Sequence, residues 1–247
     1  MDFKKMGAEF VGTAILVIGG VGAAVFAGQL IGVFGIAVAF GLTLLALVYA
    51  IGPVSGAHVN PAVTLGNVLS GRMRPVDAVQ YWVAQFLGGI LGAALVVIVR
   101  VQVPGLDQKE FGANGWGSLS QTNAHIGGAF IVEILATFLF VFVVLAVTSR
   151  AAATGTPATP AQGIAIGVAF AVAYLISMPV SGGGVNPARS LGPAIFAGGQ
   201  ALAQVWLYIV APLLGSVLAV LVHAPVAAES RVVASERQPE AAARKHS

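Results

Sequence analysis

The sequence contains no cysteine and very little charge. Without cysteine, neither a disulfide framework nor thiol chemistry can contribute to the fold or to a reaction. Charged residues make up only 9% of the 247 positions, whereas 57% are hydrophobic. A soluble domain needs far more charge to cover its surface. The composition therefore predicts a protein whose solvent is the lipid bilayer.

Six apolar stretches are long enough to cross a bilayer as helices. A spanning helix needs roughly 20 mostly apolar residues, and such stretches lie at about 7–27, 33–52, 76–99, 126–148, 161–179 and 201–223. The first stretch could pass for a signal peptide, but no small-residue cleavage site leads from it into a soluble domain. We therefore predict an all-α membrane protein with six transmembrane helices.

The basic residues sort by loop rather than clustering on one soluble face, which argues against nucleic acid as a partner. Most of them fall on one predicted side of the membrane: Lys4, Lys5, Arg72, Arg74, Arg150, Arg231, Arg237, Arg244 and Lys245. Arg100 and Lys109 fall on the other side. By the positive-inside rule both termini are cytoplasmic. Two termini on the same side require an even number of spans, and six is even. We expect a multi-pass protein of the plasma or inner membrane.

Two similar segments interrupt the simple six-helix scheme. Residues 53–66 and residues 179–192 are identical at ten of fourteen positions. A Glu-x-x-x-Thr pattern that begins at Glu9 recurs at Glu133. This spacing indicates an internal duplication of about 120 residues. Because each half holds an odd number of spans, the second half must enter from the opposite face, which makes an inverted repeat.

The duplication predicts a single domain over residues 1–224. Its two repeats cover about 5–100 and 126–224, and a polar loop, 101–125, joins them outside the cell. After the sixth span the sequence becomes polar and rich in alanine, glutamate and arginine. Such a composition cannot bury enough apolar surface to fold alone. We therefore expect residues 225–247 to be a disordered cytoplasmic tail.

Each repeated segment contains Asn-Pro-Ala, which predicts the start of a helix. Asparagine is a strong N-cap and proline is favoured at the first helical position, so helices begin at Asn60 and Asn186. The apolar residues that follow, up to about Leu69 and Phe196, are too few to cross the bilayer. Bare backbone at membrane depth is tolerated only beside a water-filled cavity or inside protein. Each segment is therefore predicted to be a re-entrant half-helix that stops halfway.

Two half-helices from opposite faces bring their N-termini together near the middle of the bilayer. Each N-terminus carries roughly +0.5 of an elementary charge, which repels cations and hydronium. A water molecule held by two asparagine amides must turn its own hydrogens outward, which breaks a chain of proton transfer. Electrostatic barriers and hydrogen-bonding linings are how pores select. We therefore predict a passive channel for small neutral molecules, with water as the first candidate.

The residues predicted to line this channel fall into two sets. The motif residues are Asn60, Pro61, Ala62, Asn186, Pro187 and Ala188. The extended backbone before them offers a ladder of carbonyl acceptors from Ala57, His58, Val59, Gly182, Gly183 and Gly184.

With both motifs in place, the sequence resembles the aquaporin (major intrinsic protein) family from about residue 5 to residue 224. The resemblance rests on the two Asn-Pro-Ala motifs, on the Arg189-Ser190 that follows the second, and on the Glu-x-x-x-Thr pairs. The loop stretch 113–117, Ala-Asn-Gly-Trp-Gly, is similar to that of bacterial and plant members. The resemblance implies a homotetramer with one pore per subunit, no cofactor, no metal and no enzymatic step.

The resemblance also implies an outer constriction, which family spacing assigns to Phe40, Tyr174, Gly183 and Arg189. Water-specific members usually carry histidine at the second position and a small residue at the third. Glycerol-conducting members carry glycine at the second and aromatics at the first and third. This sequence matches neither pattern. Either the two aromatics narrow the pore to water size, or the missing side chain at Gly183 widens one wall for glycerol or another small neutral solute.

Three further polar residues lie in or near the predicted spans. Glu9 and Glu133 are costly inside a membrane, and we expect them to be scaffold residues that accept N–H bonds from the re-entrant backbone. His58 is expected to line the inner vestibule. A secondary transporter is the main rival class, because it also uses inverted repeats and broken helices. Coupling would need a titratable residue or an ion cage at the crossing point, where the sequence has Asn60 and Asn186.

Overall fold

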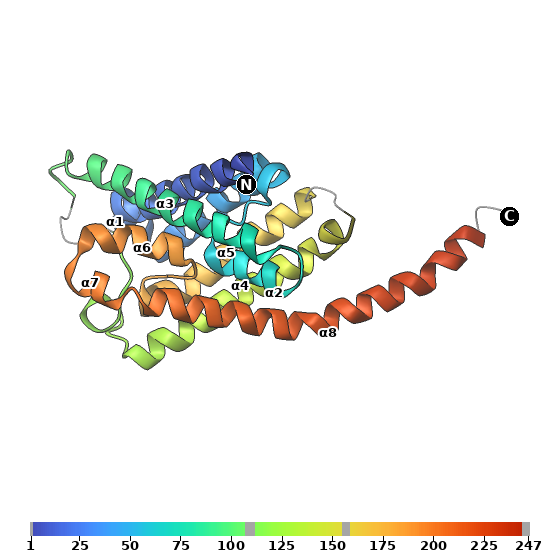
Figure 1. Cartoon of the computed structure of the whole chain (residues 1–247). Coiled ribbons are helices and arrows are strands. Elements are labelled where there is room, and N and C mark those ends of the chain that lie inside the picture. The colour runs from blue at the N-terminus through green and yellow to red at the C-terminus, as the bar shows by residue number, and fades with distance from the viewer. Residues whose placement is uncertain (1, 107–111, 155–158, 244–247) are drawn as a thin grey trace.

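The computed structural model describes residues 2–106, 112–154 and 159–243. Within these ranges the regular elements are all helical, which confirms the predicted all-α class. They are α1 (Phe3–Ser55), α2 (Pro61–Leu69), α3 (Pro75–Arg100), the 3-10 turn η1 (Gly117–Leu119), α4 (Ile126–Thr154), α5 (Pro160–Ser181), α6 (Pro187–Ala197), α7 (Gly199–Gln204) and α8 (Leu207–Ala243). Figure 1 shows the long helices lying side by side in one bundle.

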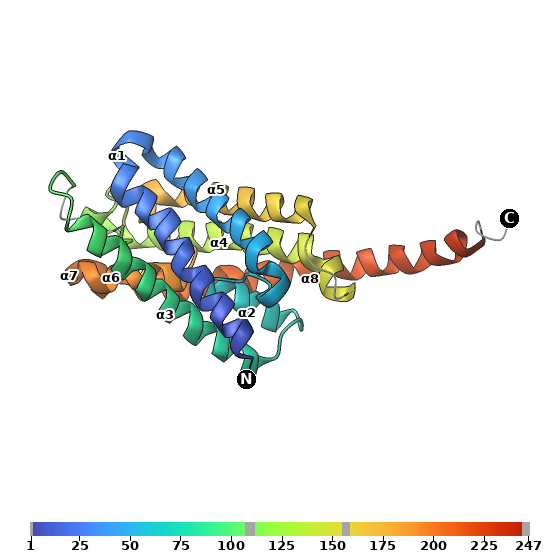
Figure 2. The same cartoon turned by 90° about the horizontal axis from the view of Figure 1, so that it is seen from above.

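Helix α1 comprises two membrane spans joined by a sharp reversal. It has 53 residues, far more than one crossing needs. Gly32 inside it has φ 61° and ψ −173°, a conformation essentially restricted to glycine. Figure 2 shows α1 doubling back on itself at the end far from the N-terminus. In the described part of the chain, five helices or helix pairs are long and apolar enough to span a membrane. Because α1 folds back and crosses twice, these five helices supply the six predicted crossings.

Helices α2 and α6 are the two short helices that begin at the repeated motifs. They have 9 and 11 residues, which at 1.5 Å per residue gives about 14 Å and about 17 Å. The hydrocarbon core of a bilayer is about 30 Å thick, so each helix reaches about halfway. Asn60 and Asn186 are their N-caps, and a proline occupies the first helical position of each. Figure 1 shows α2 and α6 on opposite sides of the middle of the bundle.

Each half-helix packs against a long helix of the other repeat, and glycine allows the close approach. A Cβ atom added at Gly192 of α6 would collide with the backbone of Gly89 in α3. On the other side, Gly66 of α2 faces Ser216 of α8, whose hydroxyl donates to Ala62 O at 2.7 Å. The two repeats are therefore interlocked rather than placed next to each other.

The segment predicted to be a disordered tail continues helix α8 as far as Ala243. Figure 1 shows this part of α8 projecting away from the bundle. Alanine, glutamate and arginine are strong helix formers, so the composition that makes the segment polar also favours a helix. The expectation of disorder rested on the polarity of the segment and left its helix propensity out of account. Lys109, Arg244 and Lys245 lie outside the described residues.

Candidate pore and its outer constriction

The two motif asparagines bond across the two repeats. Asn60 Nδ2 donates to Val185 O at 3.1 Å, and Asn186 Nδ2 donates to Val59 O at 2.7 Å. Each side-chain oxygen accepts from the second residue of its own half-helix, at 2.8 Å and 3.0 Å. Both asparagines are buried. The N-termini of α2 and α6 are therefore capped, and each N-cap asparagine is hydrogen-bonded to the residue before the other one.

The backbone before each asparagine adopts the same unusual conformation in both repeats. Val59 and Val185 have φ of 42° and 55°, and Gly56 and Gly182 have φ of 88° and 80°. A positive φ is strained for a β-branched residue, and such strain persists only where the surroundings enforce it. Its occurrence at equivalent valines in both halves indicates that the direction of these carbonyl groups matters.

Two buried carboxylates hold the strained segments in place. Glu9 accepts from the amides of His58 and Val59 at 2.9 Å and 2.7 Å. Glu133 accepts from the amides of residues 184 and 185, each at 2.7 Å. A serine hydroxyl donates to each carboxylate as well, at 2.7 Å and 2.5 Å. Both carboxylates are therefore committed to hydrogen bonds with the re-entrant backbone and its neighbours.

The carboxylate site of the first repeat has one donor that sequence reasoning missed. Gln85 Nε2 donates to Glu9 Oε2 at 2.7 Å and to Thr64 Oγ1 at 2.9 Å. Gln85 is fully buried on α3. An amide in the interior of a largely apolar span was the available signal, because a polar group buried in a membrane needs a partner.

The four residues assigned to the outer constriction come together in the structure. The rings of Phe40, on α1, and Tyr174, on α5, are stacked, with centroids 3.8 Å apart and planes inclined by 14°. Arg189 Cζ lies 5.3 Å from the Phe40 centroid and 5.7 Å from the Tyr174 centroid. These distances place the guanidinium within cation–π range of both rings. All three side chains are buried.

The ring of Tyr174 occupies the space that a side chain at position 183 would need. Gly183 has φ 70°, and an added Cβ would lie 2.9 Å from Tyr174 Cδ1 and 2.7 Å from Met178 Cγ. The Tyr174 hydroxyl donates to Gly184 O at 3.2 Å. The two atypical residues are therefore complementary, because the Tyr174 ring, together with Met178, fills the space that a side chain at 183 would take. Of the two alternatives from the sequence, the second expected the missing side chain at Gly183 to widen one wall of the pore. In the structure the Tyr174 ring fills that space.

A loop residue holds the arginine of the constriction. Arg189 Nη1 donates to Asn114 Oδ1 at 2.6 Å, and Asn114 Nδ2 donates to Gly182 O at 2.7 Å. Asn114 thus fixes both a charged side chain and the backbone beside it. No local pattern in the sequence signals this contact between residues 75 positions apart.

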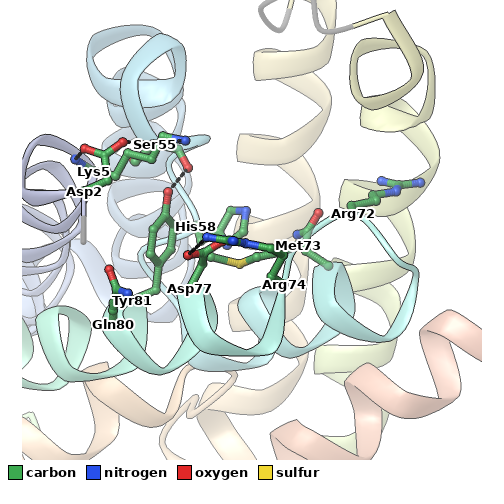
Figure 3. Close-up of a pocket in the computed structure, with 11 residues that line it drawn as sticks. Asp2, Lys5, Ser55, His58, Arg72, Met73, Arg74, Asp77, Gln80 and Tyr81 are labelled. Atoms are coloured by element: carbon green, nitrogen blue, oxygen red, sulfur yellow. Dashed lines mark hydrogen bonds and ion pairs between the residues drawn. The ribbon is translucent and has the colours of Figure 1, made fainter.

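His58 lies at the inner end of the carbonyl ladder, beside a pocket of about 470 Å³. Figure 3 shows this pocket with Tyr81, whose hydroxyl donates to Ser55 O at 2.7 Å. His58 Nδ1 lies 3.1 Å from Thr64 Oγ1. Polar and charged side chains, among them Arg72, surround the pocket. The arrangement is a polar pocket that His58, two residues before Asn60, helps to line.

The chain matches known proteins over nearly its whole length. The family described as "Major intrinsic protein" matches residues 1–223. Proteins named Aquaporin Z from Brucella melitensis biotype 1 and Bradyrhizobium diazoefficiens are each 41% identical, over 89% and 90% of this chain and 96% and 93% of theirs. Aquaporin Z from Rhodopseudomonas palustris is 41% identical over 90% of this chain and 93% of its own. The X-ray structure of the aquaglyceroporin from Plasmodium falciparum has a TM-score of 0.74 at 21% identity, covering 90% of this chain and 95% of that one, which shows a shared fold.

Proposed function

The chain belongs to the major intrinsic protein family, and from this premise we propose that it is a passive channel that conducts water and excludes protons and ions. The observation that carries the proposal is the reciprocal pair of bonds from Asn60 to Val185 O and from Asn186 to Val59 O. These bonds hold two helix N-termini at a single crossing point. No enzymatic step is part of the proposal.

The exclusion of cations follows from the two helix dipoles. The N-termini of α2 and α6 place two partial positive charges, roughly +0.5 each, on the same short stretch of the path. A cation or hydronium therefore meets repulsion from both repeats, whereas a neutral molecule does not. Arg189 adds a full positive charge at the outer constriction. The sign of the charge is the same at both points, which supports a channel without cation flux.

The hydrogen bonds available at the crossing point favour water and interrupt proton transfer. An asparagine amide has two N–H donors, and one donor of each asparagine is used in the bond across the repeats. The second donor of each remains for a permeating oxygen. A water molecule that accepts from both must point its hydrogens away from the crossing, so neighbouring waters cannot pass a proton through it.

The filled outer constriction supports water over glycerol as the permeant. The Tyr174 ring takes the space beside Gly183 and stacks on Phe40 at 3.8 Å. A polyol needs an open apolar corner for its CH groups as well as donors for its hydroxyls. In this structure the apolar corner is occupied by the protein itself. Arg189 Nε has no hydrogen-bond partner among the described residues, which leaves a donor for a small permeant.

The test is osmotic shrinkage of proteoliposomes, measured by stopped-flow light scattering with sucrose and then with glycerol as the osmolyte. We expect faster shrinkage than in protein-free vesicles, and no faster re-swelling in glycerol. Re-swelling in glycerol at a rate above that of protein-free vesicles would move the assignment to a glycerol channel. Uptake of water or solute that requires a proton or ion gradient would instead favour a secondary transporter.

The assembly and the orientation are part of the same proposal. We propose a homotetramer in the plasma or inner membrane, with one pore per subunit and both termini in the cytoplasm. The family resemblance supports the tetramer, and the distribution of lysine and arginine between the loops supports the orientation. Chemical cross-linking in membranes tests the first statement. Labelling of single introduced cysteines from either side tests the second, on a background that contains no native cysteine.

A further inference from the structure

The outer constriction is closed by aromatic contact in this structure. Phe40 and Tyr174 expose 0% of their surface, and Arg189 exposes 1%. A centroid distance of 3.8 Å between nearly parallel rings is van der Waals contact, which leaves no passage between them. The inner mouth beside His58, by contrast, is open.

We propose that Tyr174 is a gate within the constriction, closed by its stack on Phe40 and latched by its hydroxyl on Gly184 O. Water passes when the ring swings off Phe40 and the latch breaks. This inference rests on the proposed water-channel function and extends it. It assigns to Tyr174 a role in opening the path, in addition to a place in the wall.

The latch competes directly with the permeant. The Gly184 carbonyl belongs to the ladder of acceptors predicted to line the pore, and in this structure it accepts from Tyr174 at 3.2 Å. This distance is longer than the roughly 2.5–3.0 Å usual for a hydroxyl donor, so the bond is weak. When the ring leaves, the carbonyl becomes an acceptor for a passing water molecule. Opening therefore exchanges this hydrogen bond for one to water, and it also separates the stacked rings of Phe40 and Tyr174 and moves the Tyr174 ring away from Arg189.

The surroundings of the ring allow it to move. Met178 lies against the Gly183 position, one turn further along α5, and methionine is unbranched and adapts to changes in packing. Gly183 presents no side chain to obstruct the ring. The guanidinium of Arg189 is held separately by Asn114. The ring can therefore swing while the charged part of the constriction stays in place.

The experiment compares three variants in proteoliposomes at several temperatures. Tyr174→Phe keeps the ring and its stack but removes the latch, and we expect water permeability per channel to rise about 2- to 10-fold, the effect of one neutral hydrogen bond. The rise should be accompanied by a shallower temperature dependence. Tyr174→Ala removes the ring and should give a larger rise together with glycerol flux.

Tyr208→Phe is the matched control. Tyr208 is also a buried tyrosine of the second repeat, but its hydroxyl has no hydrogen-bond partner among the described residues. We expect its water permeability to equal that of the wild type. Equal permeability in the wild type and Tyr174→Phe would overturn the gate and leave the water-channel proposal standing. If Tyr174→Ala vesicles shrink no faster than protein-free vesicles, the water-channel proposal itself fails.

Discussion

Asn114 Oδ1 accepts a hydrogen bond from Arg189 Nη1 at 2.6 Å, so a residue of the loop before α4 fixes a charge that is buried among aromatic rings. The same asparagine donates to Gly182 O at 2.7 Å. A buried guanidinium without partners is expensive, and Asn114 supplies an acceptor that the apolar spans around it lack. The loop is therefore part of the constriction.

Asn114→Ala should destabilise the protein by about 2–3 kcal/mol, because it removes a hydrogen bond to a charged group. We expect a lower midpoint of thermal unfolding in detergent. Gln121→Ala, an exposed position in the same loop, serves as the control and should change stability by less than about 0.5 kcal/mol. Equal unfolding midpoints for the two variants would contradict the role given to Asn114.

Glu133→Gln should destabilise the part of the carbonyl ladder that lies in the second repeat, before Asn186. The carboxylate accepts from Ser181 and from two backbone amides, and an amide side chain offers a single oxygen while turning N–H donors toward other donors. We expect a loss of about 1.5–3 kcal/mol, the range for hydrogen bonds to a charged group. Thermal unfolding in detergent measures this loss.

The control for this prediction lies one turn further along α4. Thr137 is buried, and its hydroxyl has no hydrogen-bond partner among the described residues. Thr137→Val keeps the shape and should leave stability within about 0.5 kcal/mol of the wild type. A destabilisation as large as that of Glu133→Gln would mean that packing in this region, rather than the carboxylate, supports the ladder.

Gly183→Ala should be destabilising in the wild type and less so once the ring at 174 is removed. The added Cβ would lie 2.9 Å from Tyr174 Cδ1, at a residue whose φ is 70°. We expect a coupling free energy of about 0.5–3 kcal/mol between Gly183→Ala and Tyr174→Ala in a double-mutant cycle of unfolding stability. Gly7→Ala, where an added Cβ has no neighbour within 4 Å, is the control. Strict additivity of the two changes would contradict their complementarity.

Asn60→Asp should compromise the exclusion of protons and cations. The substitution removes the donor to Val185 O and places a negative charge where two helix dipoles repel cations. We expect a faster collapse of a pH gradient, followed by a pH-sensitive dye inside the vesicles. Asn67→Asp, at the far end of the same half-helix where Asn67 Nδ2 donates to Val63 O, is the matched control. A leak of equal size in both variants would show that the position of the charge does not matter.

Much of the path was predictable because its signals are local or repeated. Asn-Pro favours the start of a helix, and both half-helices begin at the expected residues. The duplication then placed them in opposite repeats. The role of Glu9 was predictable because a carboxylate is costly in a span and needs hydrogen-bond donors. Its bonds to the amides of His58 and Val59 offset that cost.

The remaining features depend on contacts that no local pattern encodes. The bond between Asn114 and Arg189 joins residues 75 positions apart. The volumes of tyrosine and glycine do not determine where the Tyr174 ring lies, so its stack on Phe40 cannot be derived from the sequence.

The bond between Asn186 and Val59 joins residues 127 positions apart in the chain, and this separation sets a waiting time during synthesis. At about 5–20 residues per second, the ribosome needs roughly 6–25 s to reach Asn186 after it has added Val59. Until then the carbonyl group of Val59 lacks the donor that it has in the finished protein. The first repeat must therefore persist in the membrane as an unfinished half, with water or the insertion machinery in place of its missing counterpart.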